Sequence, residues 1–338
     1  QIRCGDVLVR PKYKAAIRLF ASGLLLSGGI QAAVGAPPLR WISRGVGGGG
    51  AFFGPSISPH NPNEVFIASD MSEVFRSKDL GASWEMLDFR ELKGHMQMTS
   101  LQYTRDPNVL YALSSTDPAK STDGGATWSL LDTGVAIVYC VYADLADSNK
   151  LFTADDTKIY FSTNGGRTFS TVYTNSDLHI AGAFFNGSEI LIGTRYGLLV
   201  SINGGRSFAP ASLTGIPSTE GMVSFTGAKQ NGTNRLLCVT WSQNSIHTGL
   251  MGTELEAYRG VYRLNYGQTS VWSRATNGIG ACLLSFITTT PSNTAIAYAA
   301  GTTVGRGYPA IFKTTNGGTA WSNILKITNN VNIFTGWR

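Results

Sequence analysis

The stretch Ser121–Trp128, which reads STDGGATW, decides the fold of this 338-residue chain. Four other stretches share its pattern of Ser or Thr first, Asp or Asn third, Gly fifth and Trp or Phe eighth, and they begin at Ser77, Ser162, Ser201 and Thr314. The first four copies begin 44, 41 and 39 residues apart. A period near 40 residues is typical of proteins built from stacked supersecondary units. We call this eight-residue pattern the repeated box.

The residues of the box are those of a tight turn between two strands. Asp and Asn side chains accept hydrogen bonds from nearby backbone amides, Gly supplies a positive φ, and the closing aromatic ring covers the turn. In three copies Asn replaces Asp, which keeps the acceptor oxygen but loses the charge that a catalytic or metal-binding carboxylate needs. We therefore predict a structural role for the third residues of the five boxes, which are Asp79, Asp123, Asn164, Asn203 and Asn316.

The composition favours an all-β protein. Only 14% of the residues are charged, and 40 are glycine, which suits many strands joined by turns. The net charge of +6 comes mostly from residues 1–35, where five basic residues face Asp6 alone and leave +2 for the rest. Because no basic run occurs beyond that segment, a nucleic-acid partner is not predicted.

Residues 1–35 are predicted to be a signal peptide with an upstream extension. Arg10–Arg18 is basic, Leu19–Leu26 is a short apolar run, and Gln31–Ala36 offers small residues for cleavage. The apolar run is too short to span a bilayer, so we expect a secreted or periplasmic protein without a membrane span. The alternative is a buried N-terminal helix.

The cysteines and histidines give no pattern of a cofactor or metal site. Beyond the predicted signal peptide the cysteines are Cys140, Cys238 and Cys282. Their odd number and spacing indicate buried apolar side chains rather than disulfides. The histidines are His60, His95, His179 and His247. They are scattered along the chain, so we predict no metal ion and no cofactor.

Strand patterns fall into six sets of four between residues 36 and 338, and five sets carry a box between their third and fourth strands. This predicts a β-propeller of four-stranded antiparallel blades, six of them visible in the sequence. The fifth set has no box; its first strands are predicted at Met222–Phe225 and Arg235–Thr240, and Ser242–Tyr258 is a long insertion. A closed ring of six blades is the alternative, but because a further strand is predicted to start at Val331, we expect seven blades in the complete ring and a chain truncated at its C-terminus.

The box resembles the Asp-box, or BNR repeat, of bacterial sialidases, xyloglucanase-type glycoside hydrolases, sortilin-like receptors and photosystem assembly propellers. A narrower resemblance lies at the start of the propeller, in Gly47–Gly50, Ser58-Pro59-His60, Ser69-Asp70 and Leu87-Asp88-Phe89. These residues are similar to the first blade of xyloglucanase-type (endo-β-1,4-glucanase) double propellers. The resemblance implies polysaccharide as the partner and a second propeller domain downstream.

In that family the Asp after the second strand is the general base of an inverting hydrolase, and the resemblance assigns this role to Asp70. Inversion needs a second carboxylate roughly 6.5–9.5 Å away as general acid. The family places this acid in its second propeller, so no acid is assigned here. The sequence departs from the family where Met71-Ser72-Glu73 stands in place of Val-Gly-Gly. The alternative for Asp70 is a side chain that caps a turn.

Aromatic residues flank the long insertion and are candidates for binding substrate. They are Trp241, Tyr258 and Tyr262. Aromatic rings stack on sugar rings at clefts, but most aromatic residues of propellers belong to the core. Both readings are open at this point.

Two functions of different classes follow from the sequence. The first is a carbohydrate-active propeller, similar to glycoside hydrolases, that binds or hydrolyses polysaccharide; the alternative is a non-catalytic propeller that serves as a scaffold for protein interaction or assembly. A sialidase is disfavoured because its Arg-Ile-Pro motif does not occur in the sequence. Arg195, Arg263 and Arg306 are available, but their spacing does not indicate the arginine triad of that family.

Overall fold

The computed structural model describes residues 46, 52–71, 73–94, 101–247, 255–305 and 307–325. The chain divides into two compact units, Gln1–Ala36 and Pro37–Arg338, and every described residue belongs to the second. The predicted signal peptide, the glycine run 47–50 and the strand start at Val331 lie outside the described residues.

The first three sheets are blades 1 to 3 of the fold. Blade 1 consists of β1 (Phe52–Ile57), β2 (Val65–Ser69), β3 (Val74–Ser77) and β4 (Glu85–Met86). Blade 2 consists of β5 (Gln102–Tyr103), β6 (Leu110–Ser114), β7 (Asp117–Ser121) and β8 (Ser129–Leu130). Blade 3 consists of β9 (Cys140–Asp144), β10 (Asp147–Ala154), β11 (Lys158–Ser162) and β12 (Ser170–Thr174).

The last three sheets are blades 4 to 6. Blade 4 consists of β13 (Ile180–Asn186), β14 (Glu189–Thr194), β15 (Gly197–Ser201) and β16 (Ala209–Pro210). Blade 5 consists of β17 (Glu220–Gln230), β18 (Thr233–Ser242), β19 (Tyr258–Tyr266) and β20 (Ser273–Arg274), with short 3₁₀ turns η1 (Gln243–Ser245) and η2 (Leu255–Ala257) in its insertion. Blade 6 consists of β21 (Cys282–Thr290), β22 (Asn293–Thr303), β23 (Pro309–Thr314) and β24 (Ser322–Asn323).

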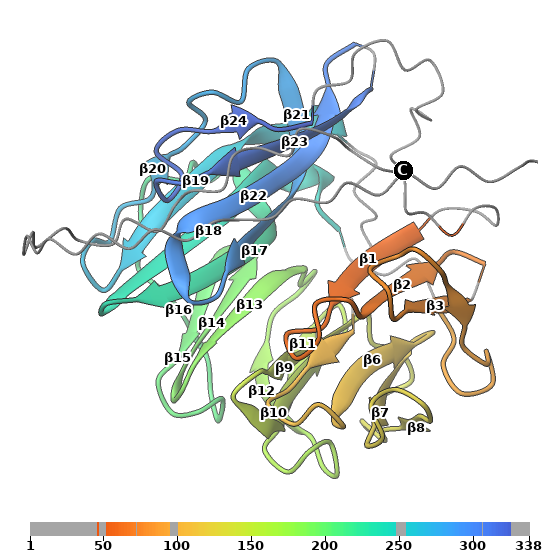
Figure 1. The fold of residues 1–338 in the computed structure, drawn as a ribbon. Helices are drawn as coiled ribbons and strands as arrows, with labels where there is room; N and C mark the ends of the chain where they lie inside the picture. Colours follow the sequence, from red (N-terminus) through yellow and green to blue (C-terminus); the bar gives the residue numbers. More distant parts are fainter. Residues whose placement is uncertain are drawn as a thin grey trace, which may run out of the picture. The chain divides into compact units, whose positions relative to one another are not determined.

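Each blade is an antiparallel meander in which the four strands pair in chain order. Figure 1 shows the six blades following one another around a common axis, with their first strands toward the centre. This confirms the predicted β-propeller of four-stranded blades. Across the residues that the structure describes, no helix is long and apolar enough to cross a membrane.

Blade 5 differs from the prediction in the length of its first two strands. Pairing in this hairpin runs from Glu220 opposite Ser242 to Gln230 opposite Thr233, well beyond the predicted strands. The reason is the two-residue turn Asn231-Gly232, whose φ angles are 50° and 77°. An Asn-Gly turn with both φ angles positive follows the twist of the flanking strands, so the ladder continues up to the turn.

The repeated box forms the same turn at each of its five positions. In blade 2 the Ser121 hydroxyl donates to Asp123 Oδ1 at 2.8 Å and accepts from the Gly125 amide at 2.8 Å. Asp123 Oδ1 also accepts from the Thr127 amide at 2.9 Å. Trp128 then covers the turn and donates from Nε1 to the Gly125 carbonyl at 3.2 Å.

Asn accepts the same backbone and hydroxyl hydrogen bonds as Asp in this turn. Asn164 Oδ1 accepts from the Ser162 hydroxyl at 3.0 Å and from the Thr168 amide at 3.0 Å, which are the bonds that Asp123 accepts in blade 2. Asn203 and Asn316 accept the equivalent pair of bonds in blades 4 and 6. The hydrogen bonds therefore depend on the acceptor oxygen and not on the charge.

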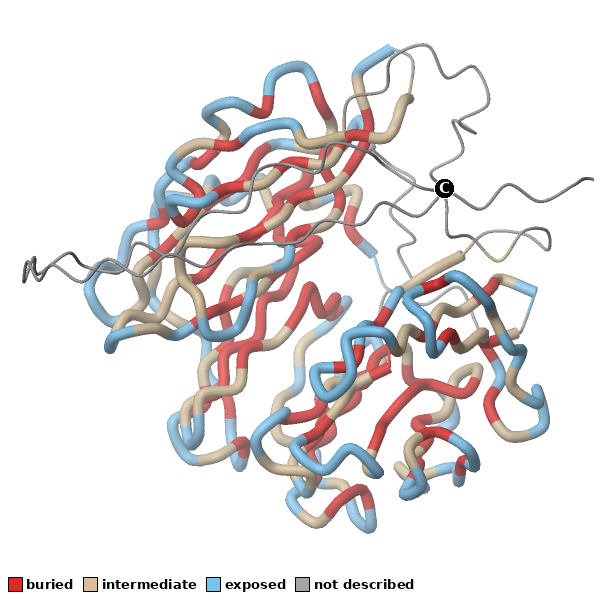
Figure 2. Tube along the Cα trace, viewed as in Figure 1, coloured by how far each residue is buried: buried red, intermediate tan, exposed pale blue. Residues whose placement is uncertain are grey.

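The hydrophobic core lies between neighbouring blades. Five clusters of buried side chains each join one blade to the next, from blades 1 and 2 to blades 5 and 6. In the first, Phe66 of β2 packs with Leu110 of β6; in the last, Trp241 of β18 packs with Phe312 of β23. Figure 2 shows the resulting pattern, in which buried residues run through the strands and exposed ones lie at the turns.

Candidate functional site

The meander places two kinds of turn at opposite ends of each blade. Turns between first and second strands share one end with the boxes, which we call the box end. Turns between second and third strands, and the connections between blades, lie at the other end, which we call the loop end. Asp70 follows β2 and the insertion follows β18, so both lie at the loop end, away from the boxes.

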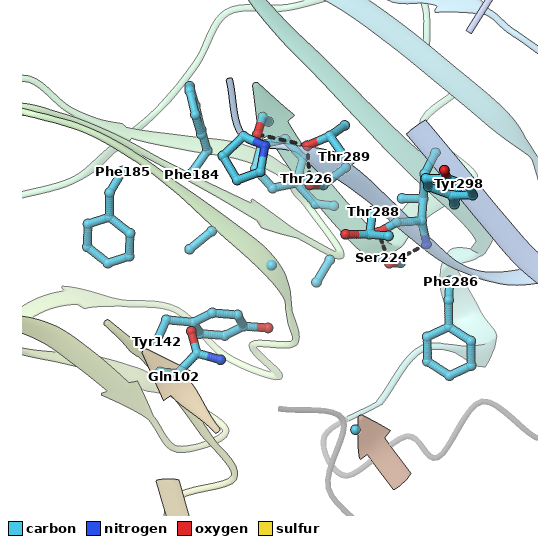
Figure 3. Close-up of a pocket in the computed structure, with 18 of the residues that line it drawn as sticks. Gln102, Tyr142, Phe184, Phe185, Ser224, Thr226, Phe286, Thr288, Thr289 and Tyr298 are labelled. Atoms are coloured by element: carbon cyan, nitrogen blue, oxygen red, sulfur yellow. Dashed lines mark hydrogen bonds between the residues drawn. The ribbon is translucent and has the colours of Figure 1, made fainter. Parts of the chain in front are cut away.

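The first strands of all six blades surround a cavity of about 1030 Å³ on the propeller axis. We call it the axial cavity. Its walls come from β1, β5, β9, β13, β17 and β21, and additionally from Tyr298–Thr302 of β22 (Figure 3). A cavity of this size is ample for a chain of several sugar units or a peptide segment.

Aromatic side chains from different blades face the axial cavity. Figure 3 shows Tyr142, Phe185, Phe286 and Tyr298 on separate strands around it. Tyr142 is supported from behind by Phe152, with ring centroids 5.1 Å apart and an interplanar angle of 25°. These rings supply apolar faces that could stack against a ligand.

Hydroxyl groups line the wall where blades 5 and 6 meet. Thr226 and Thr289 bring their Oγ1 atoms within 3.0 Å of each other, and the Ser224 hydroxyl accepts from the Ile287 amide at 3.0 Å. These bonds join the innermost strands β17 and β21 (Figure 3). They fix the polar groups of the wall in place.

Among the described residues of the cavity wall, the charged side chains are Asp144 and Lys229. Burial raises the pKa of Asp144, whose Oδ1 accepts from the Ala146 amide at 2.8 Å and so caps its own turn. Lys229 Nζ donates to Asn186 Oδ1 at 2.8 Å. The wall thus holds one carboxylate, whereas glycoside hydrolysis commonly uses two.

Asp70 lies beside the loop-end rim of this cavity. It directly follows Ser69, whose partner across the sheet is Phe52, and Phe52 lines the axial cavity. The residue is half-buried, and the next turn is held by a bond from the Met71 amide to the Ser69 hydroxyl at 3.0 Å. Asp70 is not part of the cavity wall. Its role as general base stays a prediction.

The three aromatic residues beside the insertion pack into the core. Trp241 is fully buried and donates from Nε1 to the Leu284 carbonyl at 2.8 Å. Tyr262 is also buried, and Tyr258 packs against the same cluster as Trp241. Burial raises the pKa of Tyr258 to about 12. Their packing matches the core alternative; sugar binding by them stays a prediction.

Arg195 is a buried arginine at the loop end. The sequence offered it only as a candidate for a sialidase triad, not as a link between two blades. Arg195 pairs with Asp177, and its Nη2 donates to the Gln243 carbonyl at 2.9 Å. Gln243 Nε2 returns a bond to the Arg195 carbonyl at 3.1 Å, so the arginine ties blade 4 to the start of the insertion. Nearby, burial lowers the pKa of His179 to about 4.

The arginines weighed for a sialidase triad do not converge. Arg195 lies at the loop end, whereas Arg263 donates to Thr319 Oγ1 at 2.6 Å within the box of blade 6, at the box end. Arg306 lies outside the described residues. Over the part of the chain that the structure describes, no group of three His, Cys, Asp or Glu side chains is placed to hold a metal ion.

No protein-family model and no curated protein matches this sequence. Solved structures do match the fold. The xyloglucanase of glycoside hydrolase family 74 from Xanthomonas campestris is 17% identical with a TM-score of 0.64, over 85% of this chain and 47% of that one. An ancestral enzyme of the same family is 17% identical with a TM-score of 0.63, over 84% and 39%. This chain therefore spans less than half the length of these enzymes.

A further solved structure matches over most of both chains. YCF48 bound to a D1 peptide is 14% identical with a TM-score of 0.52, over 80% of this chain and 80% of that one. At such identities these likenesses establish the fold and leave the function to the site.

Proposed function

We propose that this chain is a carbohydrate-active propeller of the xyloglucanase type that binds a polysaccharide chain in the axial cavity. The observation that carries the proposal is the wall of that cavity, which combines aromatic rings from several blades with hydroxyl and amide groups. Sugar rings have apolar faces and polar edges, so they are matched by this combination. The likeness in fold to two xyloglucanase-family enzymes supports the same substrate class.

We further propose Asp70 as the general base at the rim of the site. Its place beside Phe52 puts it within reach of a chain that leaves the cavity at the loop end. The acid partner required for inversion would then come from a second propeller, outside this chain. On this reading the chain alone binds polysaccharide, acts on it only together with that partner, and works as an exported protein.

Titration of xyloglucan oligosaccharides into the full chain tests the binding proposal. Removing one stacked ring by Tyr142→Ala or Phe286→Ala should cost about 1 kcal/mol, which is about a fivefold weaker affinity. Phe89→Ala, an exposed aromatic residue outside the cavity, is the matched control and should bind as the wild type does. Equal affinities for all three variants would show that the axial cavity is not the glycan site.

The role of Asp70 has its own test. The chain, joined to or mixed with a xyloglucanase second propeller, is assayed for reducing ends released from β-1,4-glucans. Asp70→Asn keeps the size of the side chain but cannot accept the proton from water, so it should abolish release while leaving oligosaccharide affinity unchanged. Equal rates for the wild type and Asp70→Asn would exclude Asp70 as the base.

A non-catalytic scaffold is the second candidate, and one observation favours it. The peptide-bound YCF48 structure and this chain match over 80% of each, whereas the xyloglucanases are matched over less than half their length. On this alternative the axial cavity would hold a peptide segment. Binding measurements with both ligand classes separate the two candidates. If peptides bind and xyloglucan oligosaccharides do not, the result would favour the scaffold.

A further inference from the structure

Two arginines of blade 5 face the repeated box of blade 6 at the box end. Arg235 Nη1 donates to the Gly317 carbonyl at 2.7 Å, and Arg263 Nη1 donates to the Thr319 hydroxyl oxygen at 2.6 Å. Gly317 and Thr319 are two residues apart in one turn, so the turn brings the two guanidinium groups close together. Both acceptor oxygens are neutral, and the turn therefore does not balance the two positive charges.

The surroundings of these arginines can be compared with those in blade 1, because Phe66 and Leu237 occupy the same position in the two blades. A Cβ atom on Gly125, the fifth residue of the box in blade 2, would lie 3.1 Å from the Phe66 ring. A Cβ atom on Gly318, the fifth residue of the box in blade 6, would lie 3.0 Å from Leu237. Each side chain thus supports the box of the blade that follows it.

In blade 1 the neighbours of Phe66 form an ion pair. Arg76 is the partner of Phe66 across the sheet, and Glu64 lies two residues before Phe66 along the chain. Arg76 Nε donates to Glu64 Oε1 at 2.8 Å, and Nη2 bonds to the same oxygen. The guanidinium group of blade 1 therefore has its balancing negative charge within the blade.

In blade 5 the same two positions both hold arginine. Arg263 is the partner of Leu237 across the sheet, and Arg235 lies two residues before Leu237. In the other five blades these positions hold at most one basic side chain. No salt bridge among the described residues includes Arg235 or Arg263. Blade 5 thus lacks the negative charge that blade 1 supplies.

Part of the unbalanced charge is withdrawn from water. Burial, together with the nearby charge of Arg263, lowers the pKa of Arg235. The Nε atom of Arg235 is buried and has no hydrogen-bond partner, which is costly for a charged donor. Glu189 bonds to Asn234, whose side chain points to the opposite face of β18. Both arginine side chains are half-buried, so an ion from solution can reach them.

We propose that Arg235 and Arg263 form a binding site for one tetrahedral oxyanion, a phosphate or sulfate group, at the box of blade 6. The anion supplies the negative charge that Glu64 supplies in blade 1. Guanidinium groups bind such anions through paired N–H donors, and a doubly charged group balances both arginines. Neither arginine belongs to the wall of the axial cavity, so this inference is independent of polysaccharide binding.

Nuclear magnetic resonance of the arginine Nε–H groups tests the site in the full chain. Inorganic phosphate is added while chloride is reduced to keep the ionic strength constant. The Nε–H signals of Arg235 and Arg263 should shift together and saturate, because one anion contacts both groups. Chloride alone should leave them in place. Signals that do not respond, or that respond equally to chloride, would overturn the proposal.

Substitutions test the two arginines separately. Arg235→Met and Arg263→Met each remove one charge and keep an unbranched side chain. Each should weaken the affinity for phosphate, measured by calorimetry, about tenfold or more. Arg206→Met changes an exposed arginine in the box of blade 4, so it is the matched control and should bind as the wild type does. Wild-type affinity in both blade 5 variants would contradict the site.

Arg235→Glu rebuilds the ion pair of blade 1 in blade 5. Phosphate at low concentration should raise the Tm of the wild type and of Arg206→Met, since it binds the folded state. The Tm of Arg235→Glu should not respond, and without phosphate it should equal or exceed that of the wild type. An equal response of Arg235→Glu and the wild type would mean that phosphate acts on the whole surface, and the proposal would fall.

Two probes distinguish the source of the anion. Inorganic phosphate that binds more tightly than methyl phosphate indicates a free ion. Methyl phosphate that binds at least as tightly indicates a group carried by a larger molecule, because the site then accepts an ester. Either result supports the site, whereas failure of both probes to bind contradicts it.

Discussion

Replacing Trp241 separates a core residue from a sugar-binding one. Its indole is fully buried between blades 5 and 6, where Nε1 donates to the Leu284 carbonyl of β21. Trp241→Phe removes this donor and leaves a buried carbonyl unpaired, which costs about 1–3 kcal/mol. The lost ring volume adds about 1 kcal/mol, so we expect the free energy of unfolding to fall by about 2–4 kcal/mol.

The larger substitution Trp241→Ala should cost more. Truncation of a buried Trp costs about 3–5 kcal/mol from the cavity alone, and the unpaired Leu284 carbonyl adds to it. The total approaches the stability of a typical domain, about 5–15 kcal/mol, so this variant should be largely unfolded at room temperature. The control Phe89→Leu changes an exposed ring and should alter stability by less than about 0.5 kcal/mol.

Urea unfolding followed by circular dichroism measures these differences, and titration with xyloglucan oligosaccharides is run on the folded variants. The expected result for Trp241→Phe is a lower urea midpoint with unchanged m-value and unchanged affinity. A variant that keeps the wild-type midpoint but loses affinity would refute the assignment of Trp241 to the core. It would instead support the stacking role considered from the sequence.

Three further outcomes follow from the polar groups. Hydrogen bonds from Thr127 hold the pKa of Asp123 at about 2. The contribution of the Asp123 carboxylate to folding stability is therefore present above pH 3.8 and lost toward pH 2. In acid titrations the difference in stability between the wild type and Asp123→Asn should shrink over that range. Burial holds the pKa of His179 at about 4, so stability should fall as pH drops from about 6.5 to 4, and His179→Gln should remove this dependence in urea midpoints. Arg195→Met breaks the tie to Gln243 and should cost about 1–3 kcal/mol in thermal melts, against a smaller cost for Asp177→Asn, whose carboxylate is half-exposed.

The sequence was sufficient for the fold because the box is a local signal. The side-chain hydrogen bonds that Ser121 and Asp123 make in the box all end within seven residues, so the motif reports the turn locally. The boundaries of the strands were harder to predict. The hairpin of blade 5 is longer than predicted because the Asn231-Gly232 turn, with both φ angles positive, lets the two strands pair up to the turn.

The alternation of apolar residues along β18 indicates that Trp241, one of the aromatic residues beside the insertion, belongs to the core. Leu237, Val239 and Trp241 occupy every second position of β18, so they share one face of the sheet, and all three are buried in one cluster. The position of these aromatic residues beside a long loop was a weaker indication of their role than this alternation. The axial cavity had no local signal at all, because its wall collects a few residues from each of six strands far apart in the chain.

Among the described residues, the five hydrophobic clusters have no shared centre, and this has a consequence for how the protein unfolds. Each cluster joins only two neighbours, so the blades resemble links in a row, and the stability of the whole is close to a sum of nearest-neighbour terms. Inner blades such as blade 3 have a cluster on each side, whereas blades 1 and 6 each share one cluster among the described residues. Amide exchange should therefore be graded along the row, slowest in the middle and fastest toward blades 1 and 6.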